Sequence, residues 1–143
     1  LATVIGHEIA HVLAQHSNER LSQTQLANAG LQVTSIALES SDYKEYQKIT
    51  MAALGIGVQY GLLLPYGRSQ ESEADMVGLD LMSKAGYDPH QSVALWQNMA
   101  KASQGKQPPE LLSTHPSHGT RIGDLSKRIT TLAPTNTPRP NCQ

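Results

Sequence analysis

The hydrophobic positions of this 143-residue chain recur every three to four residues along most of its length, which is the spacing typical of helices. No segment shows the strict alternation of apolar and polar residues that marks a half-buried strand. The pattern predicts helices at residues 1–15, 17–38, 43–63, 68–85, 89–103 and 117–132. We therefore expect a mainly α fold with a core of about five to six helices.

Local signals define the ends of these expected helices. Ser17 or Asn18 can cap the second helix, and the Pro-Tyr-Gly stretch at 65–67 predicts a turn between the third and fourth. Gly86 is typical of the position just after a helix C-terminus, and the Asp-Pro pair at 88–89 is typical of a helix start.

The first helix carries apolar residues on several sides, which predicts that it is buried rather than superficial. These residues are Leu1, Val4, Ile5, Ile9, Val12 and Leu13. Further along, Trp96 and Met99 lie one turn apart and are expected in the core. Gly55, Gly57 and Gly61 lack the spacing and the preceding strand of a dinucleotide-binding loop, so they favour close helix packing or a bend.

We interpret residues 1–133 as one domain and 134–143 as a proline-rich tail that is expected to be disordered. The longest apolar run, 51–64, is shorter than a bilayer-spanning helix and contains Gln59, so no membrane span is expected there. The sequence opens inside a helix without a capping residue, so we expect that preceding sequence is missing and can hold a membrane anchor. The single cysteine, Cys142, has no partner for a disulfide or a cysteine-based zinc site.

Composition and charge exclude some classes of function. The chain has 11 Lys plus Arg and 12 Asp plus Glu, for a net charge of −1, and its basic residues do not gather in one stretch. This distribution argues against a nucleic-acid partner. Phe is absent and Trp occurs once, so the core has to be built mainly from aliphatic side chains.

Candidate chemistry lies in the first helix, where residues 7–11 are His-Glu-Ile-Ala-His. Positions four apart share a helix face, so His7 and His11 can direct two imidazoles at one metal ion. Glu8 projects to the side of this pair, where its carboxylate can act as the general base on metal-bound water. The alternative is a pair of solvent-facing histidines, but burial of the helix favours the metal because unpaired buried polar groups are costly.

A third ligand has to come from another segment, and the best candidates are acidic residues of the fourth helix. Glu71 and Asp75 are four apart and share a face, whereas Glu73 is expected to be exposed or paired with an arginine. Either Glu71 or Asp75 can bind the metal while the other accepts a hydrogen bond from a histidine ligand. We expect this hydrogen bond to join His7 and Asp75. The alternative is a solvated acidic face. His16 lies too far around the first helix and is expected to be structural.

Three blocks of sequence, in this order, resemble the signature of one zinc endopeptidase family, which includes HtpX and the CAAX prenyl endopeptidases. The blocks are His7-Glu8-Ile9-Ala10-His11, Arg68-Ser69-Gln70-Glu71-Ser72-Glu73-Ala74-Asp75, and Ser113-Thr114-His115-Pro116 followed by Arg121-Ile122. Leu64-Pro65-Tyr66-Gly67-Arg68 and Gly86-Tyr87-Asp88-Pro89 are similar to its soluble, BepA-like bacterial branch. The likeness covers nearly all of residues 1–133.

The resemblance implies a zincin-like (gluzincin) catalytic domain, truncated at its N-terminus so that the small sheet of the family is missing. It implies that His7, His11 and Glu71 bind one zinc ion per chain. It further implies that Glu8 is the catalytic base and that Asp75 supports a ligand from the second shell of residues. The implied setting is the periplasm or the periplasmic face of a bacterial membrane, with unfolded or misassembled proteins as substrates.

Two residues of the third block have more than one expected role. His115 can donate to the oxyanion of the reaction, can fill the open zinc position as a self-inhibitory ligand, or can face solvent. Arg121 can be an oxyanion donor or can bridge the last helix to a carboxylate near the site. His90 and His118 are expected at the surface.

Rival hypotheses for the whole chain are a zinc-containing chaperone or scaffold that binds client proteins with little proteolysis, and a helical domain without metal. The presence of Glu8 argues against a scaffold, because a site that only holds metal does not need a base.

Overall fold

The structure is a computed structural model that describes residues 1–138 and 141. Within these residues it contains helices and no strand, which confirms the mainly α prediction. The α-helices are α1 (Ala2–Leu13), α2 (His16–Glu39), α3 (Gln47–Val58), α4 (Leu64–Lys84), α5 (His90–Ser103) and α6 (His118–Thr131). Short 3₁₀ turns lie at Lys44–Tyr46 and Glu110–Leu112, and a π-helical turn lies at Gln59–Leu63.

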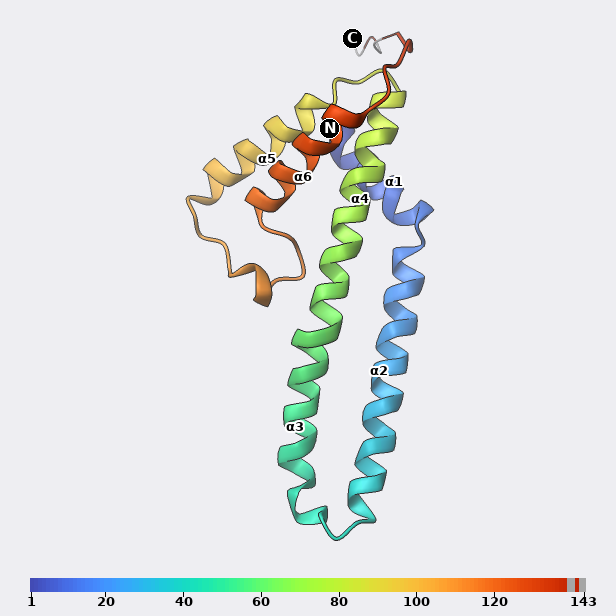
Figure 1. The fold of residues 1–143 in the computed structure, drawn as a ribbon, viewed down its shortest axis with the longest axis vertical. Helices are drawn as coiled ribbons and strands as arrows, with labels where there is room; N and C mark the ends of the chain where they lie inside the picture. The colour runs from blue at the N-terminus through green and yellow to red at the C-terminus, as the bar shows by residue number, and fades with distance from the viewer. Residues whose placement is uncertain (139–140, 142–143) are drawn as a thin grey trace.

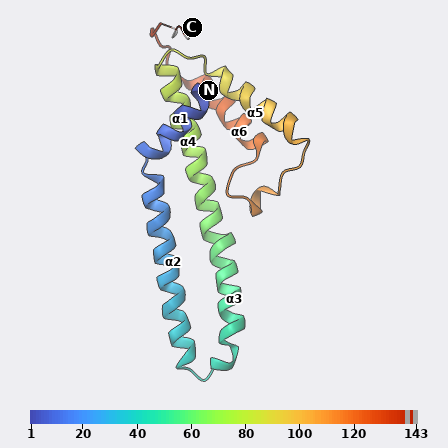
Figure 2. The same cartoon turned by 180° about the vertical axis from the view of Figure 1, so that it is seen from behind.

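The helices form a long hairpin with a small helical head (Figure 1). α2 runs away from the head, the chain turns near Lys44–Tyr46, and α3 returns beside α2 and continues into α4. α1 packs on the upper part of α4, and the pair α5 and α6 packs beside them. The view from behind shows the lower half of the hairpin standing clear of every other element (Figure 2).

The turn predicted at 65–67 is wrong, because the helix continues through it. Residues Lys44–Lys84 form one unbroken helical rod of 41 residues. Pro65 lies in the first turn of α4, directly after the π-helical turn. A π-helical turn is wider than an α-helical one, so it accommodates the proline ring and the missing N–H without ending the helix.

Gly55, Gly57 and Gly61 of this rod do not pack closely against another helix, so that expectation is wrong. Among the residues that the structure describes, no atom outside the helix's own nearby backbone lies within 4 Å of the position that a Cβ would take at Gly55, Gly57 or Gly61. Gly61 instead belongs to the π-helical turn, the kind of local irregularity at which helices bend.

The length of the rod also corrects the expectation about membrane spans. By length and composition alone, Lys44–Lys84 is long and apolar enough to cross a bilayer: an 18-residue window has a mean hydropathy of 1.4, and 6% of that window is buried. The apolar run 51–64 alone is shorter than a bilayer-spanning helix, and the break predicted at Pro65 separates it from α4.

α1 is less buried than its composition predicts. Val4, Ile5, Ile9, Val12 and Leu13 are 46–76% exposed, Leu1 just before the helix is 93% exposed, and only Gly6 and Ala10 of α1 are buried. The reason is that α1 meets α4 through glycine. A Cβ on Gly6 would lie 2.7 Å from the carbonyl oxygen of Gly78, and a Cβ on Gly78 would lie 2.7 Å from the backbone nitrogen of His7. This crossing holds the histidines of α1 against the acidic face of α4.

We expect Gly78→Ala to destabilise the fold by about 1–3 kcal/mol, because the added methyl group forces the backbones of α1 and α4 apart. Gly123→Ala on α6 is the matched control, since no other described residue comes within 4 Å of its Cβ position. That control should be neutral or stabilising by up to about 1 kcal/mol, because Ala favours helix more than Gly does. Urea unfolding curves measure the stability of both variants. Equal unfolding midpoints for the two would contradict the close contact between α1 and α4.

The core lies where α4, α5 and α6 meet. Leu79, Met82 and Leu125 form it, and Trp96 packs against them, as predicted. Met99 is 47% exposed, so its core assignment is wrong; no described element covers that side of α5.

The helix ends predicted from the sequence agree with the structure at some positions and differ from it at others. Gly86 has φ +82 after α4, which confirms the first signal. α5 begins one residue later than predicted, with Pro89 rather than Asp88 at the N-cap position, although the carboxylate of Asp88 accepts a hydrogen bond from the His90 backbone N–H at 3.0 Å. The cap predicted at Ser17 or Asn18 is wrong, because α2 already begins at His16 after Gln15 in a left-handed conformation (φ 57).

The proposed tail is described only in part. Residues 133–138 and 141 carry no regular secondary structure. Cys142 lies outside the described residues.

Candidate metal centre

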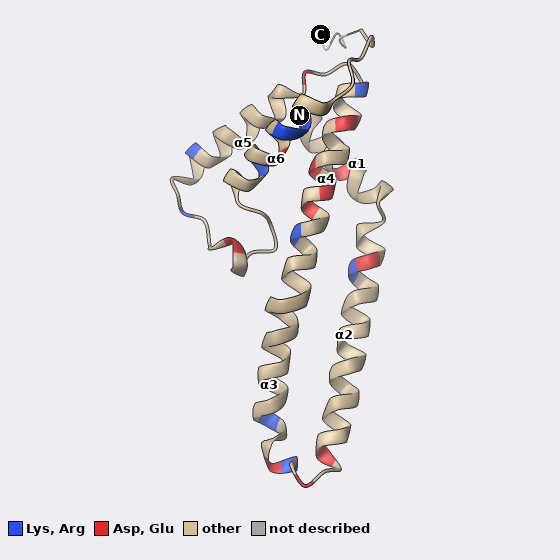
Figure 3. Ribbon diagram, viewed as in Figure 1, with Lys and Arg blue, Asp and Glu red and all other residues tan. Residues whose placement is uncertain are grey.

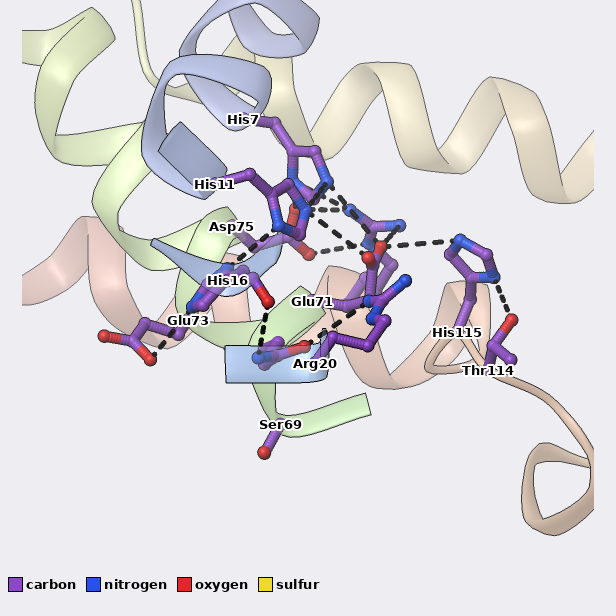
Figure 4. A network of polar contacts seen from close by, with 12 residues as sticks. His7, His11, His16, Arg20, Ser69, Glu71, Glu73, Asp75, Thr114 and His115 are labelled. Atoms are coloured by element: carbon purple, nitrogen blue, oxygen red, sulfur yellow. Dashed lines mark hydrogen bonds and ion pairs between the residues drawn. The ribbon is translucent and has the colours of Figure 1, made fainter. Parts of the chain in front are cut away.

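Three side chains from two helices converge on one point (Figure 4). His7 and His11 come from α1, and Glu71 comes from the buried face of α4. The two Nε2 atoms are 3.1 Å apart. The carboxylate oxygens of Glu71 lie 3.6 Å from His7 Nε2 and 3.3 Å from His11 Nε2. The structure therefore brings together the two histidines and one of the two carboxylates that the sequence singled out.

These separations fit a tetrahedral divalent metal. Zinc ligands lie about 2.0–2.2 Å from the ion, which puts neighbouring ligand atoms about 3.3 Å apart in a tetrahedron. The three ligand atoms of His7, His11 and Glu71 all lie within 4.8 Å of one another. A cation at their centre would satisfy all three lone pairs at once, and a tetrahedral ion would retain one open position.

A buried ion pair lies behind His7. Asp75 Oδ1 is 3.0 Å from His7 Nδ1, which is the pairing expected from the sequence. Arg121, from α6, donates to both oxygens of Asp75, from Nε at 2.6 Å and from Nη2 at 2.5 Å. A proton on His7 Nδ1 is therefore held by the carboxylate, which leaves the lone pair of Nε2 directed at the metal position.

The guanidinium of Arg121 contacts several groups beside the metal position. Its side chain is 5% exposed, and its guanidinium lies 3.6 Å from the centre of the Trp96 ring in a cation–π contact. Its Nη1 is 4.0 Å from Glu71 Oε2. Of the two roles expected for Arg121, this geometry matches the bridge from the last helix to a carboxylate.

A second support, behind His11, was missed by the sequence analysis. His16 is 2% exposed, and its Nδ1 lies 2.9 Å from Nδ1 of His11. Its Nε2 lies 3.3 Å from the carboxylate of Glu73. One proton arrangement satisfies all these contacts: His16 donates from Nε2 to Glu73 and accepts at Nδ1 from His11, whose Nε2 lone pair then faces the metal position. Glu73 is exposed as predicted, but its partner is His16 rather than an arginine.

The two histidines of α1 have opposite pKa shifts. Burial opposes a charge on His7, but the hydrogen bonds and charges of Asp75 and Glu71 outweigh it and raise the pKa of His7 to about 9. Burial, followed by the neighbouring His7, lowers the pKa of His11. A metal ion would compete with the proton for Nε2 of His7, because only the deprotonated nitrogen can be a ligand.

Glu8 lies beside the convergence point, at the junction of two hollows. One hollow of about 610 Å³ extends along α2 and is lined by His7, Glu8, His11 and Arg20 among others. The second, of about 250 Å³, lies on the side of Trp96 and is also lined by His7 and Glu8. The carboxylate of Glu8 is thus open to both hollows while it belongs to neither ion pair described above.

His115 lies at the rim of the site, in the loop before α6. Its Nε2 is 3.6 Å from Glu71 Oε2, its Nδ1 lies 2.9 Å from the Thr114 hydroxyl, and its side chain is 62% exposed. Among the other histidines, His90 is exposed as predicted. His118 is half-buried, with its ring 5.5 Å from that of Trp96, so its surface assignment is wrong; it opens α6 where that helix packs on α5.

Several characterised proteins resemble this chain in sequence. The mitochondrial metalloendopeptidase OMA1 of Schizosaccharomyces pombe is 36% identical over 129 residues, which cover 89% of this chain and 35% of that protein. The mitochondrial metalloendopeptidase OMA1 of Homo sapiens is 35% identical, with 90% of this chain and 25% of that protein covered. The β-barrel assembly-enhancing protease of Yersinia pestis is 30% identical, with 94% and 28% covered. The chain thus spans about a third or less of the length of these relatives.

The family to which these sequences point matches most of the chain. The sequence profile described as peptidase family M48 matches residues 1–129. No solved structure matched the chain. The profile match includes His7, His11 and Glu71 together with the supporting residues Asp75 and Arg121. The chain belongs to peptidase family M48.

Proposed function

We propose that this chain is the catalytic domain of a zinc-dependent endopeptidase, with the ion held by His7, His11 and Glu71. The convergence of these three ligand atoms, beside the two hollows that Glu8 lines, is the observation that carries the proposal. Two imidazoles, one carboxylate and one open position make up the ligand set of catalytic zinc in proteases. Membership of family M48 and the relatives named metalloendopeptidases support the same activity.

The reaction needs little beyond these groups. A zinc ion held by His7, His11 and Glu71 would lower the pKa of a bound water towards about 7 and would polarise the scissile carbonyl. Glu8 takes the proton of the attacking water and returns it to the leaving nitrogen. Asp75 and His16 hold the two ligand imidazoles in one tautomer, so that their lone pairs stay directed at the ion.

We assign Arg121 a positioning role rather than contact with the oxyanion, because Asp75 and Trp96 already occupy its guanidinium. His115 keeps two roles. From the rim it can donate to an oxyanion, and turned inward it can occupy the fourth ligand position and block the water.

An internal peptide bond suits this site better than a chain end. The hollows of 610 and 250 Å³ lie on either side of Glu8, so a polypeptide can extend in both directions from the scissile bond. Such a chain has to be locally extended, which favours unfolded or misassembled proteins as substrates. We propose a bacterial cell envelope, at the periplasmic side, as the setting. The relatives named β-barrel assembly-enhancing proteases favour it, whereas those named mitochondrial belong to another compartment.

Elemental analysis and casein cleavage by the purified chain test this proposal together. We expect about one zinc per chain, cleavage that stops when 1,10-phenanthroline removes the zinc, and recovery when zinc is returned. A chain that binds zinc but never cleaves would favour a zinc-containing scaffold. If the chain binds no zinc, the hypothesis that remains is a helical domain without metal.

The support behind His11 leads to a separate prediction. His16→Leu keeps the buried volume but removes the partner of His11 Nδ1, so zinc affinity should fall by about 10–100-fold. His90→Leu, at an exposed histidine, should leave affinity unchanged. Competition with a chromophoric chelator measures both affinities. Equal affinity in the two variants would reduce His16 to a packing role.

A further inference from the structure

The larger hollow beside the metal centre has one wall that the proposed reaction does not use. This wall is a single face of α2, because its residues lie three and four positions apart: Ser17, Arg20, Leu21 and Thr24. The same hollow of about 610 Å³ reaches Glu8 and Glu71, so a polypeptide bound at the metal position would pass along this face. The side chains of the wall are therefore placed to contact a bound substrate.

Arg20 is the one permanent cation among the described residues that line this hollow. It is also the only Lys or Arg of α2, a helix whose charged positions are confined to its two ends (Figure 3). Its side chain leaves α2 on the side of Glu71 (Figure 4). The carboxylates of the lining belong to Glu8 and Glu71, which serve as base and metal ligand in the proposed reaction. The α2 end of the hollow is therefore positively charged.

No carboxylate of a described residue neutralises Arg20. Its guanidinium makes one hydrogen bond within the described residues, from Nη2 to Oε1 of Gln70 at 3.4 Å. The carboxylate of the adjacent Glu19 has other partners, since it accepts from the Tyr66 hydroxyl at 2.8 Å and from Nε2 of Gln70 at 3.1 Å. The hydrogen bond from Tyr66, followed by that from Gln70, lowers the pKa of Glu19. The charge of Arg20 is thus left available to a ligand.

The side chain of Arg20 is nevertheless held in place. Gln70 is 2% exposed, and its Nε2 also donates to the backbone carbonyl of His16 at 3.3 Å. This buried amide is fixed by the two hydrogen bonds that it donates, and its oxygen holds the guanidinium beside the hollow. A side chain that is ordered in advance costs a ligand less entropy on binding.

A carboxylate is the ligand group that fits this wall best. A guanidinium presents five N–H donors in a planar fork, so Arg20 keeps donors for both oxygens of a carboxylate after its contact with Gln70. The hydroxyl of Ser17 offers a further donor on the same face. Leu21 is 58% exposed and can contact the methylene groups of an acidic side chain. The carboxylate can come from Asp or Glu within a chain or from a chain end, and the continuation of the hollow past Arg20 to Thr24 favours the first source.

We propose that Arg20 selects substrates with an Asp or Glu side chain near the scissile bond, on the side that lies along α2. Acidic segments of a polypeptide would then be cleaved in preference to neutral or basic ones. This inference rests on the proposed peptidase function and names the substrate class for that site. It makes Arg20 a specificity-determining residue.

Cleavage of matched peptides by the zinc-loaded full chain measures this preference. The parent is a fluorogenic casein peptide with blocked, uncharged ends, and one position at a time on either side of the scissile bond holds Glu, Gln or Lys. At one position we expect kcat/KM for the Glu peptide to exceed that for the Gln peptide about tenfold, because a hydrogen bond to a charged group is worth about that much. The Lys peptide should be cleaved more slowly than either.

Variants of Arg20 assign the preference to this side chain. Arg20→Gln should remove it, Arg20→Lys should keep most of it, and Arg20→Glu should favour the Lys peptide instead. Lys101→Gln removes one positive charge from an exposed position of α5 and should keep the full preference. The same preference in Arg20→Gln as in the unchanged chain would overturn the proposal. So would a preference shown only by peptides whose carboxylate is a free C-terminus, because Arg20 would then bind chain ends.

Binding without cleavage separates this inference from the proposed activity. Fluorescence anisotropy of the labelled peptides gives their Kd for Glu8→Gln, in which cleavage is expected to stop. The Glu peptide should bind about tenfold more tightly than the Gln peptide, and the difference should shrink as salt is raised from about 0.05 M to about 0.5 M. If no peptide is cleaved but this difference is present, the proposed activity fails and the carboxylate site at Arg20 stands. If peptides are cleaved but neither Kd nor kcat/KM depends on their charge, the activity stands and this inference fails.

Discussion

Glu8→Gln should abolish peptide-bond cleavage while leaving the metal in place. Glu8 is open to both hollows and is not one of the three converging ligands. An amide of the same shape cannot accept the proton of the attacking water, and general-base catalysis contributes about 10²–10⁴-fold to rate. We therefore expect kcat for a fluorogenic casein peptide to fall by about 10³-fold with zinc content unchanged.

Glu45→Gln is the matched control for this experiment, because it makes the same chemical change at an exposed site near the hairpin tip. Its activity should equal that of the unchanged chain. If Glu8→Gln retained more than a tenth of the activity, Glu8 would not be the base. Loss of zinc in the same variant would instead assign Glu8 to the metal shell.

Arg121→Met should be among the most destabilising single changes in the chain. Arg121 and Asp75 are both 5% exposed, and each guanidinium contact to the carboxylate would be lost. Removing Arg121 leaves the buried carboxylate of Asp75 with His7 in place of the bidentate guanidinium, and breaking a buried ion pair costs up to about 3–5 kcal/mol. Asp75 would then turn from His7, and zinc affinity should fall as well. Thermal or urea unfolding measures the first effect and chelator competition the second.

Two further variants separate charge from packing. Arg128→Met removes an arginine from the same helix, but its pair with Asp80 is partly exposed, so the unfolding midpoint should change little. Adding Asp75→Asn to Arg121→Met removes the unpaired charge and should recover part of the stability without restoring zinc affinity. If Arg121→Met and Arg128→Met had equal midpoints, the buried pair would not hold the site together.

Parts of the site could be predicted because they depend on helical spacing alone. His7 and His11 share a face whatever else surrounds them, and Glu71 and Asp75 do so on α4. The contact between Asp75 and His7 then follows from chemistry, because a ligand imidazole needs a partner for its other nitrogen.

What the sequence did not reveal depends on contacts between segments. The close approach of Gly6 and Gly78 sets how α1 crosses α4, and no local pattern marks two such distant glycines as partners. The same crossing explains why the apolar side chains of α1 stay exposed. His16 reaches His11 because Gln15 adopts a left-handed conformation, which helical spacing cannot predict.

The prediction of a helix break within the hairpin was wrong for a different reason. A proline normally ends a helix, so Pro65 predicts a helix boundary. The π-helical turn at Gln59–Leu63 removes the clash and joins two predicted helices into one. That continuity turned a short apolar run into a helix long enough to cross a membrane.

Anomalous X-ray diffraction from crystals of the zinc-loaded chain, recorded above and below the zinc absorption edge, tests the central claim most directly. The account predicts one peak per chain, about 2.0–2.2 Å from Nε2 of His7, Nε2 of His11 and a carboxylate oxygen of Glu71. A peak coordinated by other residues, or no peak between these three, would contradict it.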